Sequence, residues 1–237
     1  MVSILIPVYN YCITGLAEEL IRQGSTLDHP YEIIFLDDAS LDRKVSLSNQ
    51  DFCEKKKISY FISDENKGRA AARNWLAEKA QYPWLLFLDS DVFPAGPDFL
   101  KNYIASVSET SMVCSGSIAY RRDIPEEKQN LRWKYGVKYE EVSRKEKNAG
   151  KYLHVKSANL FVKKEVFNRF RFPVLKYNYG FEDTLFGLML QQEKINLKLV
   201  NNPVYHDGLE TNPEFLHKTE EGIKNLVFLI KENNPLC

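Results

Sequence analysis

The feature that most constrains this chain is an apolar run that ends in two carboxylates one residue apart. Residues 84–88 are all apolar, and Asp89 and Asp91 follow them directly. A short run rich in aromatic and branched side chains is typical of a strand buried on both faces, and ligands bind where such strands end. Neighbouring anions need compensation, so the pattern indicates either a site for Mg²⁺ or Mn²⁺ with a diphosphate, or a helix cap.

Two further predicted strands bring polar side chains to the same edge. Residues 31–36 lead into Asp38, and residues 2–6 lead into Pro7 and Tyr9. Proline halts a strand, and the tyrosine after it offers a flat ring. An edge that carries carboxylates and an aromatic ring suits a nucleotide whose base stacks and whose phosphates need a metal ion.

Five segments in this order resemble the nucleotide-sugar-dependent glycosyltransferases of family 2, which have the GT-A fold. They are residues 3–10 (SILIPVYN), 36–42 (LDDASLD), 66–74 (NKGRAAARN), 88–91 (LDSD) and 180–183 (GFED). Their order and spacing agree with that family from residue 2 to about residue 206. The resemblance implies an inverting transferase, and it leaves the sugar and the acceptor open.

Hydrophobic periodicity predicts an α/β fold. Strands alternate with helices over residues 2–118, with helices at 16–23, 42–54, 68–81 and 97–107. This repetition implies a doubly wound, mostly parallel sheet. Beyond it, the pattern predicts a strand at 154–164, a helix at 181–192, short strands at 197–200 and 203–205, and a closing helix at 213–231.

The domain organisation follows from the same pattern. No Gly/Ser/Pro linker divides the chain, so we expect one GT-A domain over residues 1–237. Within it, residues 1–118 form a nucleotide-sugar half. Residues 119–237 form an acceptor and catalytic-base half that packs on the same sheet.

The resemblance assigns the base-binding residues. Asp38 would accept a hydrogen bond from a pyrimidine base, which Tyr9 and the backbone near Pro7 would flank. The alternative is that Asp37 or Asp38 caps the helix that begins near residue 42.

Asn66 and Arg69 lie in a loop that opens a helix. Its backbone N–H groups and the guanidinium favour an anion or a nucleotide edge, so both residues are expected in the nucleotide site. The alternative for Arg69 is an exposed ion pair with Asp64 or Glu65, which would contribute only ~0 to 1 kcal/mol.

The metal residues are likewise implied by the resemblance. Asp91 would coordinate Mn²⁺ or Mg²⁺ directly, while Asp89 would hold the ribose or a metal-bound water. His206 matches the position of a metal-binding histidine in some family members. An imidazole ligand suits Mn²⁺ better than Mg²⁺. The alternative is a hydrogen-bonded structural histidine.

Glu182 and Asp183 stand at the start of a predicted helix, where an anion is stabilised and can serve as a cap as well as in catalysis. The resemblance implies that Asp183 is the general base for the acceptor hydroxyl and that Glu182 orients the acceptor or the base. Direct attack on the anomeric carbon would then invert its configuration in one displacement.

Residues 129–133 (QNLRW) are similar to the Gln-x-x-Arg-Trp string of processive family members, but they precede Asp183 and no transmembrane helices accompany them. We interpret the match as coincidence and predict transfer of a single sugar. The alternatives are a catalytically silent sugar-nucleotide binding module, a sugar nucleotidyltransferase and retaining transfer. The segment after residue 6 is not the Gly-rich loop that a nucleotidyltransferase would carry.

Composition limits the partners. With 32 basic and 32 acidic side chains in 237 residues, no global charge draws the chain to nucleic acid, and we expect none as a partner. We expect a nucleoside diphosphate sugar, with a uridine diphosphate sugar favoured, and a glycan or lipid-linked sugar acceptor. No apolar stretch approaches the ~20 residues that span a bilayer and no signal-peptide pattern is visible, so we expect a cytoplasmic protein, with peripheral contact at the inner face of a membrane as a further possibility.

Overall fold

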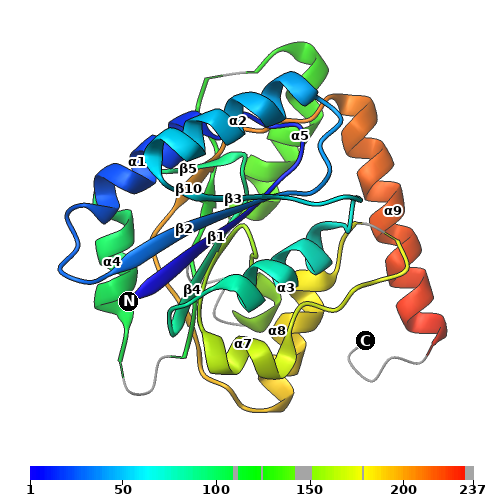
Figure 1. The fold of residues 1–237 in the computed structure, drawn as a ribbon. Coiled ribbons are helices and arrows are strands. Elements are labelled where there is room, and N and C mark those ends of the chain that lie inside the picture. Colours follow the sequence, from blue (N-terminus) through cyan, green and yellow to red (C-terminus); the bar gives the residue numbers. More distant parts are fainter. Residues whose placement is uncertain (109–111, 124, 142–150, 178, 233–237) are drawn as a thin grey trace.

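A seven-stranded sheet with the order β3-β2-β1-β4-β8-β6-β9 forms the centre of the fold (Figure 1). The structure is a computed structural model that describes residues 1–108, 112–123, 125–141, 151–177 and 179–232. The strands are β1 (Val2–Val8), β2 (Tyr31–Asp37), β3 (Ser59–Ile62), β4 (Trp84–Leu88), β6 (Val113–Ser115), β8 (Asn159–Lys163) and β9 (Leu197–Leu199).

The pairing confirms the prediction of a mostly parallel sheet. β1 pairs in parallel with β2 and β4, β2 with β3, and β6 with β9. β8 is the exception, because it runs antiparallel to both β4 and β6. The carboxyl ends of β1, β2 and β4 therefore meet at one edge, as the sequence predicts.

Helices cover both faces of this sheet. On one face pack α1 (Thr14–Gly24), α2 (Arg43–Lys56) and α4 (Phe99–Ser106), and on the other pack α3 (Arg69–Lys79), α7 (Lys164–Phe170) and α8 (Glu182–Gln192) (Figure 1). Alternate residues of β1 divide between the two cores, with Ile4 and Ile6 in the first and Leu5 in the second. Burying each such side chain contributes roughly 1.5–3 kcal/mol, so the two cores hold the strand ends in place.

A smaller sheet of order β5-β10-β7 joins the end of the chain to the turn after β4. Its strands are β5 (Val92–Pro94), β10 (Val204–His206) and β7 (Ile118–Ala119). β5 and β10 are antiparallel, with His206 paired to Val92. Because Val92 follows Asp91 directly, this register brings His206, from the C-terminal part of the chain, to the Asp89–Asp91 turn.

The predicted strand at 154–164 is too long. Residues Lys151–His154 form a 3₁₀ helix, β8 begins at Asn159, and α7 begins at Lys164. The backbone N–H of Asn159 donates to the carbonyl of Lys156 (3.0 Å), so the chain turns immediately before the strand. The seven-residue α7 is too short to show a helical period in the sequence.

The predicted closing helix is present as α9 (Asn212–Lys231), which starts with a capping box between Thr211 and Glu214. It lies beyond the carboxyl ends of the parallel strands (Figure 1). Ahead of it in the chain, α5 (Asn130–Tyr135) continues into one π-helical turn, Gly136–Glu140. Of the charged stretch at 121–150, residues 124 and 142–150 lie outside the described residues. No helix in the described part of the chain combines the length and hydropathy needed to cross a bilayer.

Candidate active site

A cleft of about 420 Å³ opens at the edge where the parallel strands end. The predicted site residues that line it are Pro7, Tyr9, Asp38, Asn66, Arg69, Asp89 and Asp91. They come from the ends of β1, β2 and β4 and from the loop before α3. The structure therefore brings the predicted nucleotide residues and one predicted metal ligand together in a single cavity.

The two neighbouring aspartates after β2 have different environments. Asp37 accepts hydrogen bonds from the Ser40 backbone N–H (2.8 Å), the Ser46 hydroxyl (2.6 Å) and the Tyr60 hydroxyl (2.9 Å). Burial alone would raise its pKa, but these hydrogen bonds outweigh burial and lower it. Asp37 is thus a structural anion that braces the end of β2.

Asp38 instead faces the cleft and organises the loop opposite. Its carboxylate accepts from the backbone N–H groups of Lys67 (2.8 Å) and Gly68 (2.9 Å), and burial raises its pKa above the ordinary value. The cap of α2 is Asp42, which accepts from the N–H groups of Lys44 and Val45, so the predicted alternative of a capping role for Asp38 is wrong. A carboxylate has about four lone-pair positions, so Asp38 keeps room to accept from a base.

Arg69 opens α3 directly after Gly68, whose φ of +79° suits glycine. The Arg69 guanidinium lies 5.0 Å from the ring centre of Tyr179. The exposed partner of Glu65 is Lys67 (3.6 Å), and within the described part of the chain Arg69 forms no ion pair with either Glu65 or Asp64. Arg69 is therefore available to a ligand in the cleft.

Arg73, one turn further along α3, is almost fully buried and connects the two acidic groups of the site. It forms an ion pair with Asp89, and its Nη1 lies 3.8 Å from Glu182. Burial raises the pKa of Asp89, but the positive charges of Arg73 and Arg69 outweigh burial and lower it. Asp89 is consequently an anion held in a fixed orientation by Arg73.

Asp91 and His206 face each other across the β5–β10 pair, with 3.8 Å between Oδ2 and Nε2. Burial raises the pKa of Asp91 despite the opposing effect of His206. The Asp91 carbonyl accepts from the N–H groups of Asp207 (2.9 Å) and Gly208 (3.2 Å). A Cβ at position 208 would come within 2.5 Å of the Asp91 side chain, so glycine is required there.

The donor atoms of this pair fit a divalent cation that is shared with a substrate. Asp91 Oδ1 and His206 Nδ1 are buried and have no hydrogen-bond partner among the described residues. No group of three or more His, Cys, Asp or Glu side chains in the described ranges could hold a metal ion alone. Mg²⁺ is commonly bound by one or two protein ligands together with substrate phosphates and water, which matches an incomplete protein shell.

Glu182 and Asp183 begin α8, next to the cleft but outside its lining. Asp183 Oδ2 accepts from the backbone N–H of Ser157 (3.0 Å), and Oδ1 is buried without a partner in the described structure. Burial and the neighbouring Asp183 raise the pKa of Glu182. The chain enters the helix through positive φ angles at Gly180 and Phe181 (φ +92° and +74°).

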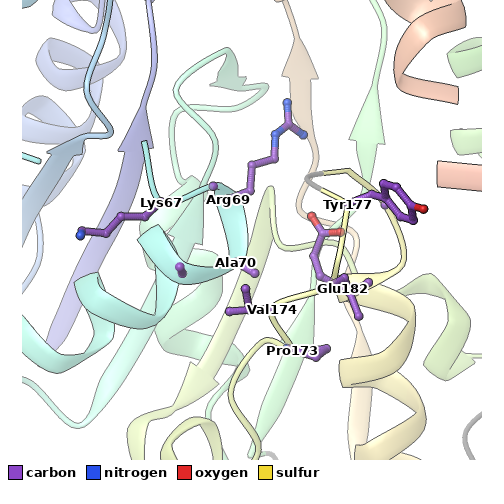
Figure 2. Close-up of a pocket in the computed structure, with 11 residues that line it drawn as sticks. Lys67, Arg69, Ala70, Pro173, Val174, Tyr177 and Glu182 are labelled. Carbon is purple, nitrogen blue, oxygen red and sulfur yellow. The ribbon is translucent and has the colours of Figure 1, made fainter. Parts of the chain in front are cut away.

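A small pocket joins Glu182 to the nucleotide cleft. Figure 2 shows Glu182, from the start of α8, and Arg69, from the start of α3, on its walls, while Lys67 points away. Gly68 and Arg69 line both this pocket and the larger cleft. Asp183 lines neither, and it is the Ser157 contact that fixes its position.

The closing helix contributes cleft residues that were not predicted from the sequence. Lys218 and Glu221, one turn apart on α9, also line the nucleotide cleft, together with Tyr11 and Tyr179. In the sequence, a lysine and a glutamate on an amphipathic helix are typical of a solvent-exposed face. Their place is set by Asn225, which lies on the same helix face two turns later and is buried in the structure, and this burial is not visible in the sequence.

The QNLRW string has structural partners in the folded chain. The Gln129 side chain donates to the carbonyl of Leu209 (2.7 Å), and the Trp133 indole donates to the carbonyl of Arg121 (2.9 Å). Arg132 is buried and pairs with Glu140 (3.2 Å) and Glu210 (3.1 Å). Pairing with these two acids compensates the charge of the guanidinium and makes its burial possible.

The fold, with its cleft at the carboxyl ends of the parallel strands, is of the GT-A type. Residues 3–170 match the model of glycosyl transferase family 2, and the chain belongs to that family. An uncharacterized glycosyltransferase of Haemophilus influenzae is 34% identical over 125 residues, which are 51% of this chain and 48% of that protein. A putative teichuronic acid biosynthesis glycosyltransferase of Bacillus subtilis is 34% identical over 92 residues, which are 38% of this chain and 36% of that protein. The chain thus spans about half, or less, of the length of these relatives.

Two solved structures share the fold. A mannosyltransferase from Pyrobaculum calidifontis in complex with GDP-Man and Mn²⁺ has a TM-score of 0.60 at 17% identity, covering 87% of this chain and 56% of its own. S. aureus TarS, residues 1–349, in complex with UDP has a TM-score of 0.55 at 20% identity, covering 89% of this chain and 59% of its own. At these identities the likeness shows the fold alone.

Proposed function

We propose that this chain is an inverting glycosyltransferase that moves one sugar from a nucleoside diphosphate sugar, with a uridine diphosphate sugar favoured, to a hydroxyl of a glycan or cell-surface polysaccharide. The observation that carries the proposal is one cleft that joins Asp38, Arg69 and Asp91, with the Glu182 pocket opening beside it. The TarS structure contains UDP, which favours uracil as the donor base. The B. subtilis relative is named for teichuronic acid biosynthesis, which favours a cell-surface polysaccharide as the acceptor.

On the donor side, the base would lie beside Tyr9 and the backbone of Pro7, and would donate a hydrogen bond to Asp38. Asp89, held by Arg73, would orient the ribose or a metal-bound water. Arg69 would contact the phosphates. These residues come from three strand ends and one loop, so a bound nucleotide would span the edge of the sheet.

Asp91 and His206 would hold a divalent cation, and this cation would neutralise negative charge on the leaving nucleoside diphosphate. An imidazole beside a carboxylate favours Mn²⁺ over Mg²⁺. The manganese complex of the structural neighbour supports the same choice.

For the transfer step, Asp183 would accept the proton of the acceptor hydroxyl on Oδ1, while the Ser157 N–H holds Oδ2. The acceptor oxygen then forms a bond to the anomeric carbon, and the bond between that carbon and the diphosphate oxygen breaks. The electron pair of the broken bond leaves with the diphosphate, and the configuration inverts. Glu182, next to Arg73, would orient the acceptor.

The test is a calorimetric titration of UDP into the protein with Mn²⁺, with Mg²⁺ and with EDTA. We expect metal-dependent binding that is tighter with Mn²⁺ and is lost in Asp91→Asn. Asp207→Asn is the matched control, because Asp207 is a nearby exposed aspartate paired with Arg121. Failure of UDP, GDP, CDP and dTDP to bind under any of these conditions would contradict the proposal, whereas binding without any hydrolysis or transfer would favour the catalytically silent module.

Product analysis then tests the inversion at the anomeric carbon and the transfer of a single sugar. With a UDP-sugar that is hydrolysed or transferred, NMR of the first product should show the anomer opposite to that of the donor, and each acceptor should gain one sugar. A retained anomer would exclude the single displacement, and a polymer ladder would exclude single-sugar transfer. The location predicted from the sequence, in the cytoplasm or at the inner face of a membrane, stays a prediction.

A further inference from the structure

Two cationic side chains from distant parts of the chain contact one aromatic ring in the nucleotide cleft. The Arg69 guanidinium lies 5.0 Å from the ring centre of Tyr179, and the Lys218 ammonium lies 5.6 Å from it. All three residues line the cleft that also contains Asp89 and Asp91. Like charges that converge on one ring repel each other, so an anion bound between them would be favoured.

Lys218 belongs to an ion-pair network at the side of the cleft. Its ammonium pairs with Glu210, and the same carboxylate also accepts from Arg132 Nε (3.1 Å). Arg132 pairs with Glu140 as well (3.2 Å). Among these acids, Glu210 is the carboxylate that Lys218 contacts, and Lys218 shares it with a second cation. A lysine ammonium has three donors, so Lys218 can keep its contact with Glu210 and still donate to a ligand in the cleft.

The position of Lys218 is fixed by the helix that carries it. Asn225, two turns later on α9, is fully buried and binds the loop before α8. Its side-chain N–H groups donate to the carbonyls of Tyr177 and Tyr179 (both 2.9 Å), and its carbonyl accepts from the Tyr177 N–H (3.1 Å). These bonds tie α9 to the segment that bears the Tyr179 ring, so the lysine and the ring are held together.

We propose that Lys218 is a phosphate-binding residue of the donor site, where it and Arg69 bind the diphosphate of the nucleotide sugar. This inference rests on the proposed function and extends it to α9, which lies outside the matched family residues 3–170. A lysine binds phosphate as a compact point charge, whereas an arginine binds it through a planar fork. The two cations would thus grip the diphosphate from α3 and α9, the two walls of the cleft.

The experiment compares the affinities for UDP, UMP and uridine by calorimetry, each with Mn²⁺ and with EDTA. We expect Lys218→Met to weaken UDP binding about 10- to 100-fold and uridine binding less than about twofold, because only the phosphates lose a charged partner. Lys218→Arg should restore most of the UDP affinity. Lys224→Met is the matched control, because Lys224 lies on the same helix and pairs with the exposed Glu220 (2.8 Å).

Each other outcome has a defined meaning. Equal losses for UDP and uridine in a variant with an unchanged unfolding midpoint would show that Lys218 acts by packing, which overturns the inference. Unchanged UDP affinity in Lys218→Met, with normal binding by the wild type, overturns it and leaves the proposed function intact. Absence of UDP binding by the wild type removes both proposals together.

A final titration distinguishes two sources of the phosphate that Lys218 could bind, namely the diphosphate of the donor and a phosphate group on the acceptor. Glycerol phosphate is titrated into the protein already saturated with UDP and Mn²⁺. If Lys218→Met weakens this binding and leaves UDP binding unchanged, the lysine serves a phosphate on the acceptor, and its assignment to the donor diphosphate is wrong.

Discussion

The two walls of the cleft are held in place by different kinds of contact. On the N-terminal wall, which the ends of β1, β2 and β4 and the start of α3 form, Asp38 accepts from the backbone N–H groups of Lys67 and Gly68 (2.8 and 2.9 Å), so the end of β2 and the loop before α3 hold each other in place. On the C-terminal wall, which α9 forms, the position of Lys218 depends on contacts between distant parts of the chain, namely the Asn225 side chain with the Tyr177 backbone and the Glu210 side chain with Arg132. The difference suggests that substitutions on the first wall will change ligand binding locally, while those on the second will change stability and geometry together.

The largest effect should separate chemistry from nucleotide binding. Asp183→Asn should lower the rate of sugar transfer or donor hydrolysis at saturating donor about 10²- to 10⁴-fold, because it would remove the proposed general base. The affinity for UDP should change less than twofold, since Asp183 does not line the nucleotide cleft. Calorimetry and a turnover assay on the same preparation measure both quantities.

Glu182→Gln provides the matched comparison, because it lies at the same helix start. We expect a smaller loss of rate, since Glu182 contacts Arg73 and would only orient the acceptor. An Asp183→Asn variant that keeps full activity, or one that loses rate and UDP affinity in parallel, would remove Asp183 from the role of base.

A smaller effect concerns the stability of the C-terminal wall. The exposed fraction of the Arg132 side chain is 6%, and this side chain pairs with Glu140 (3.2 Å) and Glu210 (3.1 Å). Arg132→Met should lower the free energy of unfolding by about 3 kcal/mol, because it leaves two poorly exposed carboxylates without their shared partner. Urea unfolding followed by circular dichroism measures the change.

Arg121→Met is the control for this prediction. Its ion pair with Asp207 (2.7 Å) is largely exposed, so the same substitution should cost only ~0 to 1 kcal/mol. Equal losses for the two variants would show that burial of the Arg132 network contributes nothing, and the contrast between the two walls would then lose its energetic basis.

These contrasts also explain how far the sequence could lead. The residues of the N-terminal wall follow strand ends, and the carboxyl ends of parallel strands meet at one edge whatever the loops do. Asp38, Asp89 and Asp91 could therefore be placed together from the sequence, and the cleft contains all three. His206 was predicted from the resemblance, and the register of β5 with β10 brings it to Asp91.

The C-terminal wall could not be predicted in this way. Lys218 is seven residues from Asn225, and the hydrogen bonds of that buried amide help to set which face of α9 turns toward the cleft. In the sequence, the charged residues of this helix do not distinguish the face toward the cleft from the face toward solvent. Arg132 was missed for the same reason, because its burial depends on acids that come from two other segments.

The smallest effect contrasts Asp37 with Asp38 through the sign of their pH dependence. The pKa of Asp37 is lowered in the folded protein, so its ionised form stabilises the fold above the unfolded value of about 3.9, and this contribution is lost as pH falls through the folded pKa. The pKa of Asp38 is raised by burial, so its ionisation costs stability as pH rises from the unfolded value toward the folded pKa. The free energy of unfolding should be measured between pH 3 and pH 7 for the wild type and both variants. As pH rises, the stability of the wild type relative to Asp37→Asn should increase. The stability of the wild type relative to Asp38→Asn should decrease. Slopes of the same sign would mean that the two neighbours share one environment, and Asp38 would then lose its distinction as the acid that faces the ligand.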